Sequence, residues 1–367
     1  MRLLYIADQL IAYGTAQKVV AMATEWERRG HAVWLVTARN PAPRRVSDVA
    51  PILRRAAPAR GLPERIVGEA SLRWFYPLAL GQACARLGID LIYSRGTPPA
   101  PGLRRLIRRV PFVLEVNSDI EQEIPRRLRR WSRVRSRGMQ LASADGAVFV
   151  SRELSRALEP KPRRALVLAN ACLPVEPGVE RPAPPSRPTL VLIGYSKHDW
   201  SGIDRMPELA AALPDLDFVV IGTDVTGPAN LRSHPALTQA EADRVMSGCT
   251  VGIGPLALYR KNMHEASPLK SRNYLALGLP IIQAYEDTDL SEADGCILEL
   301  PNREDNLTNS LARIREFAWR AFRDPTLSQR AHALAHGRLS LAAKERERLA
   351  FFETCRAERA HAGTERP

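Results

Sequence analysis

One short segment, Glu265 to Gly278, combines groups that could bind an anion with signals that begin and end a helix. Ser267 is expected to cap this helix, because its hydroxyl can accept hydrogen bonds from the free N–H groups of the first turn. Pro268 follows at the first helical position, where the missing N–H is not needed. A helix start carries unpaired N–H groups and a partial positive charge, and Lys270 adds a full charge. The segment predicts a phosphate site, although an ordinary capped helix in an α/β sheet has the same signals.

Three further residues complete the chemistry of this segment. Asn273 comes one helical turn after Lys270 and shares its face. Gly278 is placed to end the helix in a left-handed conformation. Glu265 precedes the helix start, where a carboxylate beside an anion is unfavourable unless it binds something else, such as sugar hydroxyls. A carboxylate that is simply solvated remains the alternative for Glu265.

The same residues carry a resemblance to a known family. From Glu265 to Pro280 the chain resembles the E-x7-E segment of retaining GT-B glycosyltransferases, particularly family 4, where a P-L-K-type helix start precedes E-Y-L-A-x-G-x-P. The resemblance implies that Glu265 is catalytic and that the helix start binds the diphosphate of a nucleotide-sugar donor. The donor-binding candidates here are Ser267, Pro268, Leu269, Lys270 and Asn273. Asn273 stands where the family has a second glutamate that commonly holds the ribose, which leaves the affinity for the donor open.

Composition limits the class of protein. The chain has 367 residues, of which 45% are apolar and 25% charged, enough to bury the cores of two ordinary domains. Its five cysteines are scattered, which favours a reducing compartment and argues against a zinc site. Neither a signal peptide nor an apolar run of about 18 residues that could span a bilayer is evident. We therefore expect a cytoplasmic protein, with peripheral contact to the inner face of the membrane left open.

The first part of the chain predicts a βαβ unit. Arg2 to Ala7 is an apolar run typical of a buried strand, Ala16 to Arg29 has helical periodicity, and Ala32 to Thr37 is the next strand. Between the first strand and the helix lies a loop with Gly14 and Thr15. The loop is similar to the G-G loop of GT-B enzymes, which implies that Gly14 and Thr15 face the donor phosphates. A simple tight turn at Gly14 is the alternative.

A second catalytic candidate lies at the end of a later strand. Pro111 to Asn117 is predicted to be a strand, and ligands of open parallel sheets bind beyond the carboxyl ends of strands. Asn117 is therefore a candidate contact to the acceptor or to the transferred sugar. A polar strand end without a ligand explains the residue equally well.

Two arginine-rich segments account for much of the net charge of +13, Leu103 to Arg109 and Ile124 to Gly138. In the second segment apolar residues, Trp131 among them, recur at helical spacing between arginines. A basic amphipathic helix with tryptophan suits an anionic membrane surface. A solvated helix is one alternative. Nucleic acid is another, but no recognised nucleic-acid module is visible and aromatic residues are sparse.

The chain is expected to form two α/β domains joined by a proline-rich linker. The bounds are 1–174 for an acceptor-side Rossmann-like domain, 175–188 for the linker, 189–325 for a nucleotide-sugar-binding Rossmann-like domain, and 326–367 for a helix crossing back to the first domain and a tail. The resemblance implies the GT-B fold, two facing Rossmann-like domains with a cleft between them. It also places a phosphate loop at Gly194 to Gly202, where Lys197 is the nearest cation.

The predicted function is that of a retaining glycosyltransferase of the hexosyltransferase class. The resemblance implies transfer from a nucleotide sugar to a hydroxyl of a glycan or lipid-linked glycan, in cell-surface polysaccharide or glycoconjugate synthesis. No paired carboxylate or D-x-D motif is evident in the sequence, so neither a metal nor another cofactor is expected to hold the diphosphate. A GT-B-like binding protein that no longer transfers sugar is the alternative, suggested by Asn273.

Overall fold

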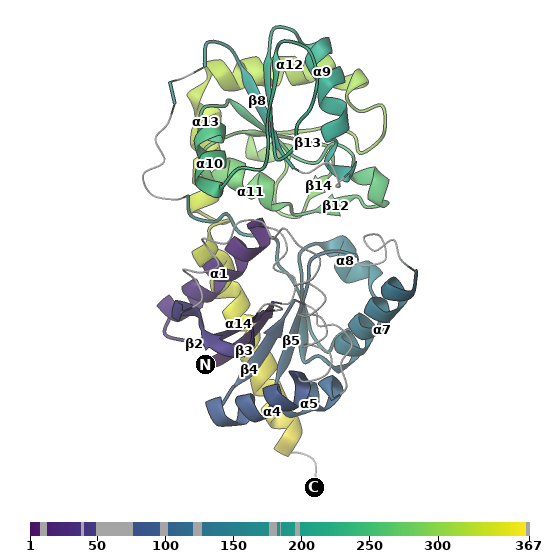
Figure 1. Cartoon of the computed structure of the whole chain (residues 1–367), viewed down its shortest axis with the longest axis vertical. Coiled ribbons are helices and arrows are strands. Elements are labelled where there is room, and N and C mark those ends of the chain that lie inside the picture. Colours follow the sequence, from purple (N-terminus) through teal and green to yellow (C-terminus); the bar gives the residue numbers. More distant parts are fainter. Residues whose placement is uncertain are drawn as a thin grey trace. The chain divides into compact units, whose positions relative to one another are not determined.

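The computed structural model describes residues 1–7, 13–37, 40–48, 76–95, 102–119, 127–175, 182–183, 185–194 and 199–364. The chain divides into two compact units (Figure 1). The first consists of Met1–Leu168 with Leu341–Pro367, and the second of Ala169–Ser340. The chain therefore passes between the units at Leu168–Ala169 and again at Ser340–Leu341, whereas the sequence had suggested bounds at 174 and 326.

The first unit is built on a sheet that, among the described residues, has the strand order β3-β2-β1-β4-β5-β6-β7. Neighbouring strands are parallel except β2 and β3. The strands are β1 (Arg2–Ala7), β2 (Ala32–Thr37), β3 (Asn40–Arg45), β4 (Leu91–Ser94), β5 (Phe112–Val116), β6 (Gly146–Phe149) and β7 (Ala165–Val167). The order reverses between β1 and β4, which makes the carboxyl end of this strand pair a favoured place for ligands.

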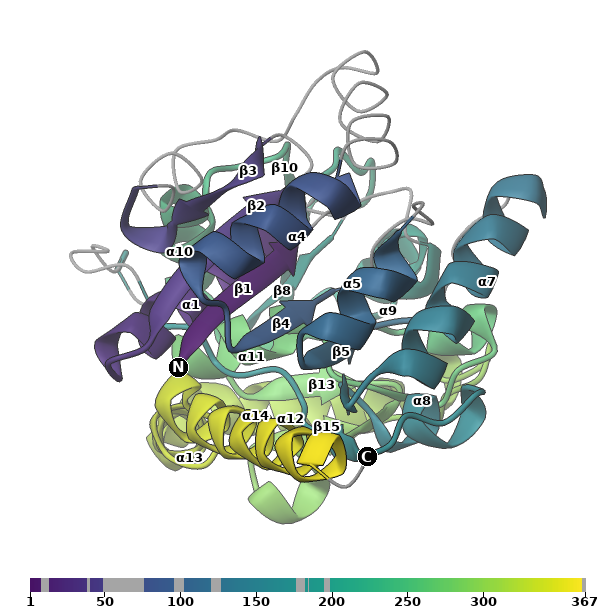
Figure 2. The same cartoon turned by 90° about the horizontal axis from the view of Figure 1, so that it is seen from below.

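Helices cover both faces of this sheet. On one face α1 packs against α14, and on the other α4, α5 and α7 form a row (Figure 2). The helices are α1 (Tyr13–Arg28), α4 (Tyr76–Leu87), α5 (Leu103–Arg109), α7 (Arg127–Ser143), α8 (Arg152–Ala157) and α14 (Leu341–Thr364). The terminal helix α14 is held by aromatic packing, because the ring of Phe352 lies 4.9 Å from that of Tyr93 and 5.6 Å from that of Trp26.

The second unit has a parallel sheet with the order β10-β9-β8-β11-β13-β15 among its described residues. The strands are β8 (Thr189–Ile193), β9 (Asp217–Ile221), β10 (Leu231–His234), β11 (Val251–Ile253), β13 (Ile281–Gln283) and β15 (Ile297–Glu299). A separate short pair joins β12 (Glu265–Ala266) to β14 (Glu286–Asp287). The order of the large sheet reverses between β8 and β11.

The second unit carries the helices α9 (Met206–Ala212), α10 (Gln239–Ser247), α11 (Leu269–Ala276), α12 (Leu311–Arg323) and α13 (Pro325–His336). Its core is formed by the large sheet together with the apolar faces of these helices. Gly252 in β11 allows α11 to lie close to the sheet, since a Cβ at this position would lie 2.3 Å from ring atoms of Tyr274.

Two predicted element starts need correction. The helix α1 begins at Tyr13 rather than Ala16, so Gly14 and Thr15 lie in its first turn and not in a loop. The helix α11 begins at Leu269, with Pro268 as its N-cap residue in an extended conformation. No helix in the described part of the chain is long and apolar enough to cross a membrane.

Candidate functional site

The clearest candidate site lies at the carboxyl ends of β8 and β11 in the second unit. Gly194 follows β8, and Gly254 follows β11. The start of α11 is directed to the same place, because a Cβ at Gly194 would lie 3.3 Å from the Nζ atom of Lys270. The point where the strand order reverses thus brings together a glycine, a helix start and a lysine, as in many anion sites of α/β proteins.

Lys270 is the most informative side chain at this place. Its Nζ atom is buried and has no hydrogen-bond partner among the described residues. Burial lowers the pKa of Lys270 to about 7, because a charged ammonium is costly away from water. A buried ammonium without a partner favours an anionic ligand, since such a ligand would provide the missing hydrogen bonds and the counter-charge.

Ser267 does not cap α11 as predicted. Its hydroxyl accepts hydrogen bonds from the backbone N–H of Asn170 and from Nη2 of Arg272, each at 2.9 Å. No side chain caps the first turn of α11 in the described structure. The Ser267 hydroxyl bonds Arg272 because this buried arginine needs an acceptor. The start of α11 is therefore left without a side-chain partner among the described residues.

Glu265 lies in β12, directly before the turn that leads into α11. Its residue is only 4% exposed, and the strand pairs Glu265 with Glu286 of β14. The structure therefore excludes the alternative of a simply solvated carboxylate. Five residues predicted for the catalytic and donor site lie together between β12 and the first turn of α11: Glu265, Ser267, Pro268, Leu269 and Lys270.

The rest of α11 is fixed by contacts with the sheet and with α13. The hydroxyl of Tyr274 accepts a hydrogen bond from the backbone N–H of Ile193, at the end of β8, at 2.9 Å. Gly278 has φ of 79°, which confirms the predicted left-handed helix end, and a Cβ there would lie 2.4 Å from His332. Asn273 is half-buried in the helix, one turn after Lys270.

Trp200 is a site residue that the sequence reasoning missed. Its ring centre lies 4.9 Å from Nζ of Lys261 and 5.8 Å from Nζ of Lys270. Arg260, next to Lys261, forms a bidentate pair with Asp204 and is already neutralised. Lys197, the predicted phosphate-loop cation, lies outside the described residues.

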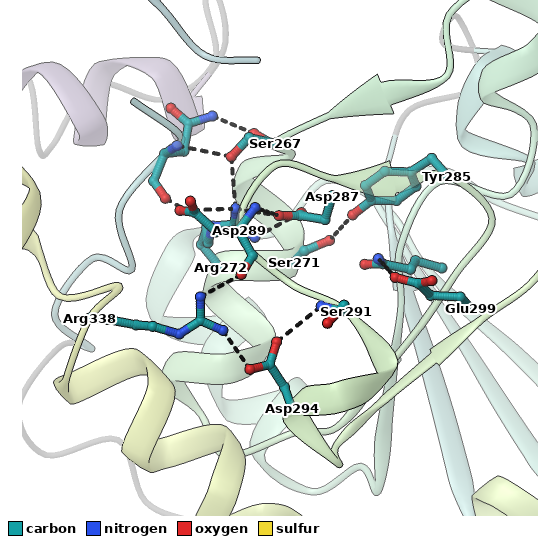
Figure 3. Close-up of polar contacts among 12 residues, drawn as sticks. Ser267, Ser271, Arg272, Tyr285, Asp287, Asp289, Ser291, Asp294, Glu299 and Arg338 are labelled. Atoms are coloured by element: carbon teal, nitrogen blue, oxygen red, sulfur yellow. Dashed lines mark hydrogen bonds and ion pairs between the residues drawn. The ribbon is translucent and has the colours of Figure 1, made fainter. Parts of the chain in front are cut away.

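A D-x-D spacing at Asp287 and Asp289 escaped the sequence reasoning. Such a pair can hold a divalent cation, but both carboxylate oxygens of Asp287 accept hydrogen bonds from Arg272 (Figure 3). Within the described residues no group of three or more histidine, cysteine, aspartate or glutamate side chains is arranged to hold a metal. Asp287 therefore acts as the partner of an arginine.

The other catalytic candidate, Asn117, lies in the first unit, just beyond β5. Its Oδ1 atom accepts a hydrogen bond from Nζ of Lys18 at 3.0 Å, and the same ammonium lies 2.5 Å from Oε1 of Glu115. Burial lowers the pKa of Lys18 to about 8, although Glu115 opposes the shift. Burial alone would raise the pKa of Glu115, but Lys18 and Arg95 hold it well below its usual range.

Thr15, in the first turn of α1, is half-buried. Lys18 lies one turn further along the same helix, so Thr15 and Lys18 share a face of α1. The sequence could have indicated Lys18 by its i,i+3 spacing from Thr15. The bond to Glu115 joins residues far apart in the sequence, which no local pattern reveals.

The basic segment forms α7 in part. Its first predicted residues, 124–126, lie outside the described residues, and the side chains of residues 127–130 are not described. Trp131 is 62% exposed, whereas Arg133 and Arg137 are buried. Arg137 pairs with Asp119 at 3.0 Å. The alternative of a helix whose arginines are all solvated is therefore wrong for Arg133 and Arg137.

Comparison with known proteins agrees with this architecture. Residues 13–171 match the model of Glycosyltransferase Family 4. No curated protein sequence matches the chain. Sucrose-phosphate synthase from Thermosynechococcus elongatus superposes with a TM-score of 0.64 at 12% identity, covering 98% of this chain and 100% of its own.

Two more solved structures are similar over nearly the whole chain. HepE from Anabaena, in complex with UDP-glucose, has a TM-score of 0.62 at 11% identity, covering 96% of this chain and 100% of its own. A glycosyltransferase from Rickettsia africae has a TM-score of 0.60 at 11% identity, with coverage of 96% and 98%. The chain therefore has the GT-B fold of these glycosyltransferases, and its residues 13–171 are similar to Glycosyltransferase Family 4.

Proposed function

We propose that the protein transfers a sugar from a nucleoside-diphosphate-sugar donor to a hydroxyl acceptor, with retention at the anomeric carbon. The observation that carries the proposal is the buried ammonium of Lys270, which has no hydrogen-bond partner among the described residues and lies at the start of α11. A diphosphate matches this place in charge and in hydrogen-bonding capacity. HepE, a protein of the same fold, binds UDP-glucose, which supports a donor of this class.

In this proposal the first turn of α11 and Lys270 hold the diphosphate and stabilise its charge as the bond to the sugar breaks. Glu265 binds sugar hydroxyls or stabilises the positive charge that develops on the sugar ring. Asn273 contacts the ribose through hydrogen bonds without charge. Ser267 acts indirectly, by fixing the turn before the helix. Gly14 and Lys197 keep the donor-phosphate roles that the family resemblance implies.

The departing diphosphate serves as the base in the proposed reaction. The acceptor hydroxyl attacks on the face from which the diphosphate leaves and gives its proton to a phosphate oxygen. The positive charges of Lys270 and the helix start offset the charge of the leaving group, so we propose that no divalent metal or other cofactor is required.

Asn117 is proposed to orient the acceptor or the transferred sugar from the first unit. Its amide oxygen already accepts from Lys18, so its NH2 group remains the natural donor to a ligand. Thr15, another predicted donor contact of this unit, lies on the same helix as Lys18.

The acceptor is proposed to be a glycan or lipid-linked glycan used in cell-surface polysaccharide or glycoconjugate synthesis. The support is the strongly exposed Trp131 in the arginine-rich helix α7, a combination that suits the surface of an anionic membrane. A cytoplasmic protein that docks on the inner face of the membrane would meet such an acceptor there.

The absence of a glutamate at Asn273 favours one second candidate, a GT-B-like protein that binds nucleotide sugars without transferring them. A thermal-shift screen of nucleotide sugars and nucleoside diphosphates tests donor binding, because a ligand that binds only the folded state raises the melting temperature. A rise for at least one donor is expected, and a flat response across the panel would reject the proposal. Release of the nucleoside diphosphate from the donor that binds then separates a transferase from a binding protein.

A further inference from the structure

Arg272 is fully buried in α11, two residues after Lys270 and on another face of the helix. Its guanidinium bonds Asp287 with two parallel hydrogen bonds, Nη1 to Oδ2 at 2.9 Å and Nη2 to Oδ1 at 2.8 Å. Nη2 also donates to Oγ of Ser267, and Nε donates to the carbonyl oxygen of Asn170, each at 2.9 Å. One side chain thus links three separate segments of the second unit (Figure 3).

The first linked segment is β14, which pairs with the strand that carries Glu265. Asp287 lies in β14, where the register pairs it with Ala266 and pairs Glu286 with Glu265. The backbone N–H of Thr288 donates to the carbonyl oxygen of Ala266 at 3.3 Å. The position of the Glu265 strand relative to α11 therefore depends on the Arg272–Asp287 pair.

The second and third linked segments are the turn before α11 and the chain that enters the unit. Asn170 is the second residue after the passage at Leu168–Ala169. Its backbone N–H donates to Oγ of Ser267, and its Nδ2 donates to the carbonyl oxygen of Ser267. Arg272 accordingly holds Asn170 and Ser267 together through one hydroxyl and one carbonyl.

The loop after Asp287 also receives an arginine from near the second passage of the chain. Arg338 donates to the carbonyl oxygen of Asp289 at 2.6 Å and to Asp294 at 2.5 Å. Close by, the backbone N–H of Cys172 donates to the carbonyl oxygen of Leu339 at 2.8 Å. Both passages are therefore tied to the polar cluster behind the start of α11 (Figure 3).

A buried arginine–aspartate pair adds little stability compared with apolar side chains of similar size, because both charges lose their hydration. The pair instead fixes the directions of the hydrogen bonds that Arg272 makes. A planar guanidinium that donates to three acceptor groups fixes their relative positions more strictly than apolar packing can.

We propose that Arg272 is a positioning residue of the donor-diphosphate site, which sets Glu265 and the start of α11 in one fixed arrangement through Asp287, Ser267 and Asn170. This inference rests on the proposed function. Arg272 itself touches no ligand in this arrangement. Its loss is expected to loosen the turn at Ala266–Lys270 and the segment at Leu168–Cys172 while the core of the unit stays intact.

The test uses the full chain and three variants. The double variant Arg272→Met with Asp287→Leu replaces the ion pair by apolar side chains and leaves no unpaired buried charge. Arg272→Lys keeps a charge for Asp287 but cannot reach three acceptors in fixed directions. Arg313→Met is the control, because it removes an arginine from an exposed pair with Glu292 in the same unit.

Hydrogen exchange of the empty protein is measured first, and the Kd for UDP, GDP, ADP and TDP second. The double variant is expected to stay folded, to exchange amides in the two segments at least about tenfold faster, and to bind the preferred diphosphate at least about tenfold more weakly. The exchange rates and the Kd of Arg272→Lys should lie between those of the double variant and the wild type. Both quantities should match the wild type in Arg313→Met.

The outcomes separate the two hypotheses. Unchanged exchange in both segments, or unchanged binding in a folded double variant, overturns the positioning role of Arg272. A wild type that binds none of the four diphosphates instead overturns the proposed function. If the double variant does not fold, the same comparison is made with Arg272→Lys, and wild-type exchange and binding in that variant overturn the inference.

Discussion

The ammonium nitrogen of Lys270 lies 5.8 Å from the centre of the Trp200 ring, and that of Lys261 lies 4.9 Å from the same centre. An aromatic face attracts a cation but supplies neither a hydrogen bond nor a full negative charge. Two lysines therefore share one ring, and the ammonium of Lys270, which has no hydrogen-bond partner among the described residues, would gain one from a bound anion.

The binding of a nucleoside diphosphate should weaken as the pH rises from 7 to 9. In the empty protein the pKa of Lys270 is lowered to about 7 by burial, so the side chain loses its proton over this range. A bound diphosphate favours the ammonium, and binding must then take up a proton, which costs up to about tenfold in affinity per pH unit. Isothermal titration calorimetry at several pH values measures how the affinity for the nucleoside diphosphate changes with pH.

The variant Lys270→Met serves as the matched control for that titration. It should bind the diphosphate at least about tenfold more weakly at pH 7, because a charge-assisted hydrogen bond is lost, and its affinity should no longer depend on pH in this window. A wild-type affinity that stays constant between pH 7 and 9 would contradict the assignment of Lys270.

Glu265→Gln keeps the size and hydrogen bonding of the side chain and removes its charge. We expect turnover to fall by at least about tenfold, equivalent to ~1.4 kcal/mol in the barrier, because the charge acts on the sugar during transfer. The nucleoside diphosphate should still bind with wild-type affinity, since in the proposed site the diphosphate is held by α11 and not by Glu265. Steady-state kinetics with the donor and acceptor measure the first effect, and equal rates for both proteins would remove Glu265 from the reaction.

Asn273→Glu tests the ribose contact. If Asn273 bonds a ribose hydroxyl, a charged acceptor in its place should preserve or tighten nucleotide binding. The measurement is the Kd of the preferred nucleoside diphosphate for both proteins. A clear loss of affinity would show that the position serves another purpose in this chain.

Gly252→Ala should destabilise the second unit by about 1–3 kcal/mol, because the new methyl group meets the ring of Tyr274 and must displace it. The displacement also strains the bond between Tyr274 and the N–H of Ile193. Chemical denaturation measures the free energy of unfolding. Gly81→Ala is the control, since a Cβ at this helical glycine meets nothing within 4 Å, and a gain of about 0.5–1 kcal/mol is expected there.

Much of the fold follows from local sequence patterns. Buried parallel strands such as Thr189–Ile193 appear as short apolar runs, and the left-handed end of α11 is encoded by Gly278 itself. The candidate anion site was predictable for the same reason, because a helix start and Lys270 are neighbours in the sequence.

The features that local patterns did not reveal all depend on contacts between distant residues. Ser267 has the sequence signature of a cap, yet its hydroxyl accepts hydrogen bonds from Asn170 and Arg272. These partners come close only in the folded chain. The bond between Lys18 and Glu115 has the same origin. Trp200 joins the site only because the folded chain brings it beside Lys261 and Lys270.

Membrane docking through α7 is tested by two variants that separate charge from apolar insertion. Replacing Arg126, Arg127, Arg129 and Arg130 by glutamine should weaken binding to anionic vesicles at low salt, because each arginine near the surface contributes roughly 1 kcal/mol and salt screens it. Trp131→Ala should lower binding even at high salt, since the exposed indole would insert by apolar contact.

Co-sedimentation with anionic and neutral vesicles at two salt concentrations measures both effects, and binding of a nucleoside diphosphate is the control. That control should be unchanged in both variants, because α7 belongs to the first unit and the proposed diphosphate site to the second. If the wild type and the four-arginine variant sediment equally with anionic vesicles, the arginines of this segment do not dock the protein on a membrane. If Trp131→Ala also sediments like the wild type at high salt, the indole does not insert into the membrane either.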